Sequence, residues 1–278
     1  MILKIDHLAF CTTHMEHAIK AFETLGYDLH FKETGLRDLE NKKDLMHHFS
    51  GTLDMTFMTR RGSISIELLD HGHATPGDSY ILPVLECALF DVQALDDSFA
   101  GSKHAFVRVQ SDLLKAQFFI PKEMRTVGFQ CNTAIAETDN LEQSTVFWRH
   151  LGFNPISIDH QVTHLEFKAP LSKECFQLFL RKKDSRTKQF GLDTQGFNCI
   201  AFMSTDTEKD RRKFERMGMA PTETNLFRVN GRDLYIFWTR GPGGEIVEII
   251  GLTGSLPRDG YCGYYPFPSM VQDHHHAQ

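Results

Sequence analysis

Glu248 is the residue of this sequence whose surroundings point most directly to chemistry. It stands between Ile246 and Ile250 on one face of an apolar run that follows the turn residues 241–244. Burying an isolated charge is costly, so such a carboxylate either reaches a cavity or has a cation, a metal ion or a hydrogen-bond partner. In an apolar cup without a metal it could act as a general base with a raised pKa. An exposed position on an edge strand explains this stretch alone equally well.

The residues around Glu248 predict a β-hairpin over 233–251. Two apolar runs, 234–238 and 246–250, flank a Gly- and Pro-rich turn. Because side chains alternate along a strand, Glu248 shares its face with the two isoleucines, whereas the residues on either side of it point to the opposite face.

This hairpin closes the third of three similar segments. Each segment begins with a strand-like run, continues through a helix that ends at a glycine, and finishes with alternating apolar runs. The expected helices cover about 13–25, 141–151 and 207–217, and they end at Gly26, Gly152 and Gly218. Each copy is therefore a β-α-β-β-β module, which cannot cover its own sheet and must pair with another copy.

The modules predict an α+β protein with two domains. The N-terminal domain, 1–123, holds a module at 1–70 and a stretch, 71–123, that is either a degenerate module or an insertion. The C-terminal domain, 124–253, holds modules at 124–183 and 195–251, and a tail follows at 254–278.

Composition limits the classes of function. The chain has 278 residues, of which 41% are hydrophobic and 24% charged, and its net charge of -6 without a basic stripe makes nucleic acid an unexpected partner. No apolar run is long enough to span a membrane, and the start lacks a signal-peptide pattern. The six cysteines have no CxxC spacing, which favours free thiols in a cytoplasmic protein. The oligomeric state, including a homodimer, stays open.

The repeat resembles the module of the vicinal oxygen chelate superfamily, which includes glyoxalase I, methylmalonyl-CoA epimerase, extradiol dioxygenases and bleomycin-resistance proteins. The resemblance rests on residues 5–10, 21–27 and 66–69, and it covers about 1–70 and 126–251. It implies repeated βαβββ modules paired into two half-barrel cups, an extradiol-dioxygenase-like architecture. It also implies a divalent metal ion (Fe, Mn, Ni, Co or Zn), held by residues of the first and last strands of the paired modules.

This resemblance assigns roles to individual positions. The implied metal ligands are His7, Glu67 and Glu248. The implied substrate-binding residues are Thr133, Gln177 and Phe237. The implied catalytic residues are Glu248, Cys199 and Trp238. The sequence departs from the extradiol pattern at three of these positions, because Cys199 and Thr133 stand where histidine ligands are expected, and Trp238 where a catalytic tyrosine is expected.

Two pairings of the modules stay open. If modules pair in chain order, one cup holds Thr133, Gln177, Cys199 and Glu248, and the other holds His7, Glu67 and a residue from 71–125. If the first module pairs with the second, a cup holds His7, Glu67, Thr133 and Gln177.

Either pairing is compatible with a glyoxalase- or dioxygenase-like small-molecule enzyme, that is, a lyase, an isomerase or an oxygenase. Such an enzyme would combine a metal ion with a carboxylate base on a substrate with vicinal oxygens. The alternative is a metal-free protein of the same fold that binds or sequesters a small molecule, as resistance proteins do.

Overall fold

The computed structural model describes most of the chain. The described residues are 1–77, 79–85, 92–101, 104–111, 114–122, 131–183 and 190–252. The predicted tail at 254–278 lies outside them.

The three predicted helices are confirmed. They are α1 (Met15–Thr24), α2 (Leu141–His150) and α3 (Thr207–Arg216). The side chains of Asn140 and Asp206 accept hydrogen bonds from backbone N–H groups in the first turns of α2 and α3, which is the usual way to begin a helix. Gly26, Gly152 and Gly218 follow the helices with φ of 78°, 99° and 77°. Glycine adopts this left-handed conformation without a steric penalty, so the helices stop there.

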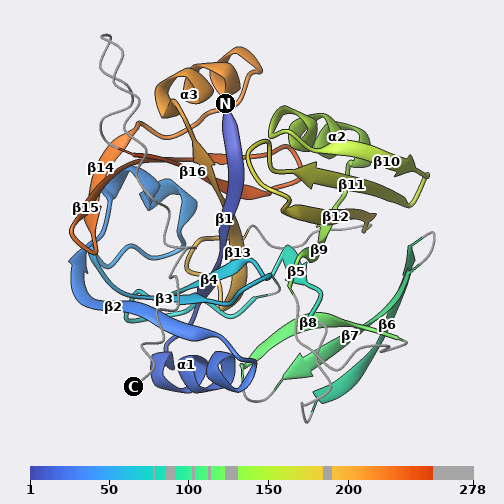
Figure 1. Cartoon of the computed structure of the whole chain (residues 1–278), viewed down its shortest axis with the longest axis horizontal. Coiled ribbons are helices and arrows are strands. Elements are labelled where there is room, and N and C mark those ends of the chain that lie inside the picture. Colours follow the sequence, from blue (N-terminus) through green and yellow to red (C-terminus); the bar gives the residue numbers. More distant parts are fainter. Residues whose placement is uncertain are drawn as a thin grey trace, which may run out of the picture.

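A sheet of eight strands dominates the molecule, and we call it the large sheet. Its strand order is β14-β15-β16-β13-β1-β4-β3-β2, with β1 and β13 crossing the centre of Figure 1. The bounds are β1 (Ile2–Cys11), β2 (Asp28–Arg37), β3 (Thr52–Thr59), β4 (Ser65–Asp70), β13 (Gly196–Ser204), β14 (Asn225–Val229), β15 (Arg232–Arg240) and β16 (Ile246–Leu252). The predicted hairpin is confirmed as β15 and β16, with Trp238 opposite Glu248.

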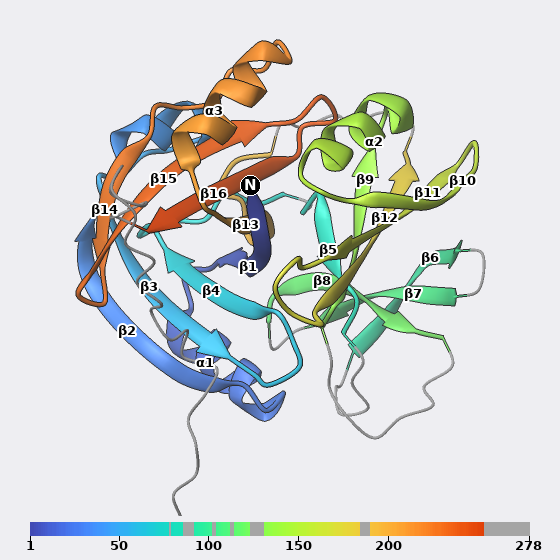
Figure 2. The same ribbon diagram turned by 45° about the horizontal axis from the view of Figure 1, so that its top comes forward.

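The large sheet joins the first module to the third through antiparallel pairing of β1 with β13. Both pairings expected from the sequence are therefore wrong. The sheet curves until its two ends approach each other (Figure 2), and the backbone N–H of Asn230 donates a 2.8 Å hydrogen bond to Glu33 of β2. The result is a nearly closed barrel whose concave inner face we call the cup.

The second module, together with β5 from the stretch before it, builds a separate sheet of five strands in the order β10-β11-β12-β9-β5. The bounds are β5 (Ile81–Pro83), β9 (Thr133–Thr138), β10 (Asn154–Ile158), β11 (Val162–Lys168) and β12 (Cys175–Lys182). A third sheet contains β6 (Val92–Gly101), β7 (His104–Ser111) and β8 (Ala116–Pro121). An isolated parallel bridge joins Val84, the residue after β5, to Phe119 of β8.

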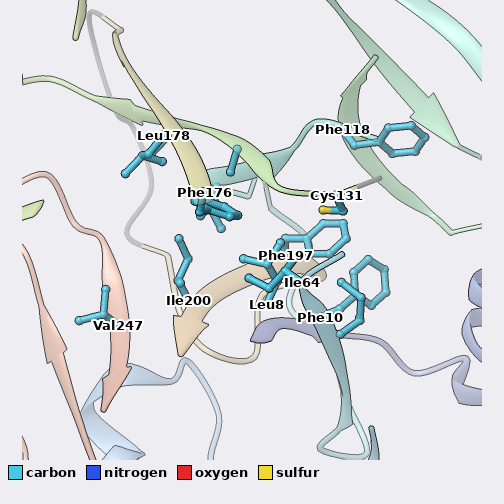
Figure 3. Close-up of a cluster of buried hydrophobic side chains, with 14 of the residues drawn as sticks. Leu8, Phe10, Ile64, Phe118, Cys131, Phe176, Leu178, Phe197, Ile200 and Val247 are labelled. Atoms are coloured by element: carbon cyan, nitrogen blue, oxygen red, sulfur yellow. The ribbon is translucent and has the colours of Figure 1, made fainter. Parts of the chain in front are cut away.

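The main hydrophobic core lies between the two larger sheets and under the helices. Leu8, Phe10 and Ile200 of the large sheet belong to the same buried cluster as Phe176 and Leu178 of β12 (Figure 3). The inner face of the large sheet has its own buried cluster, which includes Ala9, Cys199, Ala201 and Trp238. Among the described residues, no helix has both the length and the apolar character needed to cross a membrane.

Candidate metal centre

Three side chains from three strands of the large sheet meet in the cup. The Nε2 atom of His7 lies 3.2 Å from Oε2 of Glu67 and 3.5 Å from Oε2 of Glu248. One ligand atom from each residue fits within 4.8 Å of the others, and all three residues are buried. The cluster therefore consists of one imidazole and two carboxylates facing a common point.

The strand register explains why these side chains converge. Glu248 lies beside Ala201 in the parallel pair of β13 and β16, and Ala201 lies beside His7 in the antiparallel pair of β1 and β13. Glu67 lies beside Ala9 in the parallel pair of β1 and β4. The two alanines are buried in the inner cluster. Because their side chains end at Cβ, space remains above them for the longer side chains to meet.

Asp6 holds the other nitrogen of the His7 ring. Its Oδ2 atom lies 3.2 Å from Nδ1 of His7, and its Oδ1 atom lies 2.9 Å from Nζ of Lys4. The register of β1 against β13 shifts between Ile5 and His7, and such a bulge re-aims the side chains of a strand. A carboxylate on the second ring nitrogen fixes the orientation and tautomer of a ligating histidine.

Burial and neighbouring charges shift the pKa values of His7, Glu248 and Asp6. Burial alone would lower the pKa of His7, but the negative charge of Glu67 and the contacts with Asp6 and Glu248 raise it well above its ordinary value. Burial raises the pKa of Glu248, and Glu67 adds to this effect, while His7 opposes it. Burial also acts to raise the pKa of Asp6, but His7 and Lys4 lower it well below its usual range.

The residues present fit a divalent cation. The Nε2 atom of His7 is buried and makes no hydrogen bond of normal geometry, which is costly for a polar atom unless something else binds it. Imidazole and carboxylate groups are ligands for Zn²⁺, Mn²⁺ and Fe²⁺. A cation between these side chains would satisfy the imidazole and cancel the repulsion between the carboxylates.

A short segment, residues 38–48, packs into the cup around the 3-10 helix η1 (Glu40–Leu45). Leu45 belongs to the inner cluster of the cup, and Lys42 lies over the ring of Trp238. The segment is fastened at its end by Asp193, whose carboxylate accepts hydrogen bonds from the backbone N–H groups of His47 and His48 at 2.8 and 2.9 Å.

Comparison with known proteins identifies this architecture. No protein-family model matches the sequence, and neither does any curated protein. The solved structure of a candidate dioxygenase from Bacillus subtilis aligns with a TM-score of 0.61 and 10% identity, over 91% of this chain and 86% of that chain. Glyoxalase I from Zea mays aligns with a TM-score of 0.55 and 13% identity, over 89% of this chain and 92% of that chain. These structures belong to the superfamily that the sequence repeat resembles.

The chain has the vicinal oxygen chelate fold. At these identities the likeness is one of fold, and it leaves reaction and metal use to be argued from the residues themselves.

Within this vicinal oxygen chelate fold, the predicted residues divide between the two larger sheets. His7, Glu67 and Glu248 come together in the cup, with Trp238 and Cys199 on the same inner face. Thr133 and Gln177 pair with each other in the sheet of the second module. The amide of Gln177 bonds there with His164 and Glu166. The structure therefore does not bring Thr133 and Gln177 to the cluster.

Phe237 requires a correction. The sequence assigned it to substrate binding, but its ring packs 6.2 Å from that of Phe214 in α3 and it is buried in the main core. It precedes Trp238 on β15, and neighbouring residues of a strand point to opposite faces. Trp238 faces the cup, so Phe237 faces the helix.

Cys199 faces the cup, but its chemistry differs from that of a histidine ligand. Its thiol is buried, and burial raises its pKa well above the ordinary value, with Glu248 and Glu67 adding to the shift. A thiol in these surroundings stays protonated and is a poor nucleophile.

Four residues of the cup were not singled out from the sequence. They are Asp6, Asp38, Lys42 and Asp193. Asp6 carried a usable signal, since it directly precedes His7 on a mostly apolar strand. The other three lie in polar stretches that read as loops, where no periodicity indicates which side chains turn inward.

Proposed function

We propose that this chain is a metal-dependent enzyme of the vicinal oxygen chelate type, in which His7, Glu67 and Glu248 hold one divalent cation. The observation that carries the proposal is the buried Nε2 atom of His7, which faces two carboxylates and has no hydrogen-bond partner of normal geometry. A structural histidine of a sheet would have satisfied that atom with a carbonyl or a hydroxyl group.

A bound divalent cation would supply Lewis-acid chemistry, polarising two neighbouring oxygens of a small-molecule substrate and stabilising the negative charge that develops on them. Asp6 keeps the imidazole of His7 in the orientation in which Nε2 can bind. Of the two carboxylates, Glu248 has a pKa raised by burial against the opposing effect of His7. We therefore assign to Glu248 the uptake of a proton from the substrate.

The donor set supports a reaction without a change of oxidation state. Ring-cleaving and related non-haem iron oxygenases use two histidines and one carboxylate, whereas this cluster offers one histidine and two carboxylates. We therefore favour an isomerase or lyase over a dioxygenase. Isomerisation of a 2-oxoaldehyde–thiol adduct by metal-loaded protein would support this choice, and consumption of oxygen with a catechol would reverse it.

Metal analysis tests the proposal directly. The purified protein, reloaded in turn with Mn²⁺, Fe²⁺, Co²⁺, Ni²⁺ and Zn²⁺ and then dialysed, should retain about one equivalent of at least one metal. The His7→Gln variant should lose that metal. The His164→Gln variant is the matched control, because His164 also bonds to a side chain within a sheet but lies in the second module.

Less than roughly 0.1 equivalent of every metal in the wild-type protein would sink the metal-dependent proposal. The remaining function would then be that of a metal-free protein that binds or sequesters a small molecule.

The cysteines among the described residues are free thiols, which supports a reducing compartment such as the cytoplasm.

A further inference from the structure

Lys42 is a buried cation on the segment that packs into the cup. It is 5% exposed, and lysine is rarely buried to this extent unless it is paired. Its Nζ atom lies 2.6 Å from Oδ1 of Asp38 and 5.6 Å from the centre of the Trp238 ring. The charge is thus held at the aromatic wall of the cup rather than extended into solvent.

The position of Trp238 puts this charge beside the metal centre. Trp238 lies directly opposite Glu248 in the β15–β16 pair, and residues opposite each other in an antiparallel pair have side chains in contact range. The charge of Lys42 acts on Glu248 and on Cys199, opposing the rise that burial causes in the pKa of both.

The ammonium group of Lys42 has capacity for another acceptor. It carries three N–H donors, and within the described part of the chain Asp38 provides its one ion pair. The other donors have the face of an indole beside them, which attracts a cation but accepts no hydrogen bond of ordinary strength.

Asp38 can release Lys42 without losing every partner. Its Oδ2 atom lies 3.2 Å from Nδ1 of His71, and both side chains are fully buried. Neither Oδ2 of Asp38 nor the ring nitrogens of His71 make a hydrogen bond of normal geometry. A turn of the Lys42 side chain toward another anion would therefore leave Asp38 with an imidazole that can donate to it.

We propose that Lys42 is an anion-binding residue of the cup, so that the substrates are small negatively charged compounds that also carry two neighbouring oxygens. This inference rests on the proposed function, because the neighbouring oxygens are those that face His7, Glu67 and Glu248. Two glutamates and a divalent cation cancel in charge, and Lys42 then supplies the attraction for the anionic group. The ring of Trp238 offers the rest of the substrate a flat apolar surface.

Two ligands that differ by one carboxylate test whether the cup binds a negative charge. 3,4-Dihydroxybenzoate and catechol share a ring with two neighbouring oxygens, and the first also carries a carboxylate. Anaerobic titrations of Mn²⁺-loaded protein, followed by calorimetry and by intrinsic tryptophan fluorescence, should show roughly tenfold tighter binding of 3,4-dihydroxybenzoate than of catechol. The Lys42→Met variant should bind the two probes equally, while Lys42→Arg should keep part of the preference.

The matched control is Lys43→Met, which removes an exposed lysine from the same 3-10 helix and should keep the full preference. Because the charge of Lys42 acts on Glu248, the Mn²⁺ affinity of each variant is measured first, and the probe titrations are run at saturating Mn²⁺. An undiminished preference in Lys42→Met, or no preference in the wild-type protein, would overturn the inference.

The design separates this inference from the proposed function. If no metal binds to the wild-type protein, the proposed function fails, and the same titrations are run without metal. A carboxylate preference that is present in the wild-type protein and absent from Lys42→Met then still supports anion binding by Lys42. Equal behaviour of the two proteins in that experiment rejects it.

Discussion

His7 and Asp6 are neighbours in sequence, yet Nδ1 of His7 lies 3.2 Å from Oδ2 of Asp6. In a regular strand their side chains would point to opposite faces of the sheet. The register shift between Ile5 and His7 removes that constraint. As a result, Asp6 fixes the ring from one side, and the other ring nitrogen faces Glu67 and Glu248.

Replacing Asp6 by Asn should therefore weaken metal binding without removing a ligand. We expect a loss of roughly 10–100-fold in Mn²⁺ affinity, the usual effect of deleting a carboxylate that orients a ligating histidine. Calorimetric titration measures it. Asp159→Asn is the control, because Asp159 also contacts a neighbouring histidine, His160, at 2.9 Å but in an exposed turn. Equal Mn²⁺ affinities of Asp6→Asn and the wild-type protein would mean that Asp6 does not orient His7.

Glu248→Gln should stabilise the metal-free protein. Burial raises the pKa of Glu248 in the folded state, with His7 opposing and Glu67 adding to the shift. Its contribution to stability is therefore present at acid pH and is lost as the pH rises through the folded-state pKa. At neutral pH we expect the variant to unfold with a free energy about 1 kcal/mol higher than that of the wild-type protein.

Bound metal should make the wild-type protein more stable than Glu248→Gln. Mn²⁺ at about 100 times its dissociation constant should stabilise the wild-type protein by about 2.7 kcal/mol and the variant far less. Urea unfolding with and without Mn²⁺ measures both effects. Glu166→Gln provides a contrast, because hydrogen bonds from Lys168, Gln177 and Cys175 lower the pKa of Glu166 to about 2, so its removal should not stabilise. A metal-free Glu248→Gln protein less stable than wild type would show that the carboxylate is not strained.

The faces of the strands could be predicted from the sequence, whereas the pairing of the modules could not. Alternation along β16 correctly predicted that Glu248 shares a face of the strand with Ile246 and Ile250, and all three residues are buried. Each module, however, offers a similar first strand as a partner. The choice of β13 as the partner of β1 is accompanied by contacts such as that between Phe10 and Phe197, whose ring centres lie 4.8 Å apart. Such complementarity has no periodic signature.

The position of residues 38–48 inside the cup could not be predicted from the sequence either. The segment Glu40–Leu45 consists mainly of polar residues and reads as a surface loop, but it turns inward. It is held there by Asp193, which is 146 residues away from His47 in sequence. Contacts at such separations depend on the finished barrel, so Lys42 and Asp38 could not be placed in the cup beforehand.

Asp193→Asn should loosen residues 38–48. The wild-type carboxylate accepts one backbone hydrogen bond on each oxygen, whereas an asparagine side chain can accept on one oxygen. We expect a loss of about 1–3 kcal/mol and faster amide exchange at His47 and His48 than in the wild-type protein. Asp44→Asn, an exposed change in the same segment, should leave exchange unaltered. Unchanged exchange in Asp193→Asn would show that the segment is held by other contacts.

The same carboxylate predicts a pH effect. Burial acts to raise the pKa of Asp193, but the backbone hydrogen bonds lower it below its ordinary value. A depressed folded-state pKa contributes stability that is present above the pKa of the unfolded chain, about 3.9, and is lost as the pH falls through the folded-state value. Protection of His47 and His48 should therefore fall with acidification below about pH 4 in the wild-type protein. It should change less in Asp193→Asn, and parallel profiles would contradict the prediction.

Cys199 should behave as a wall of the cup rather than as a nucleophile or a ligand. Burial raises the pKa of its thiol well above the ordinary value, Glu248 and Glu67 add to this, and Lys42 opposes it. Iodoacetamide should therefore leave Cys199 unmodified in the native protein and label it after unfolding, as peptide mass spectrometry can measure, while the half-buried Cys175 reacts earlier. Cys199→Ala should keep the Mn²⁺ affinity of the wild-type protein. Native-state alkylation of Cys199 would show that its thiol is reactive. Loss of Mn²⁺ binding in Cys199→Ala, with binding retained in Cys175→Ala, would show that the thiol is a ligand.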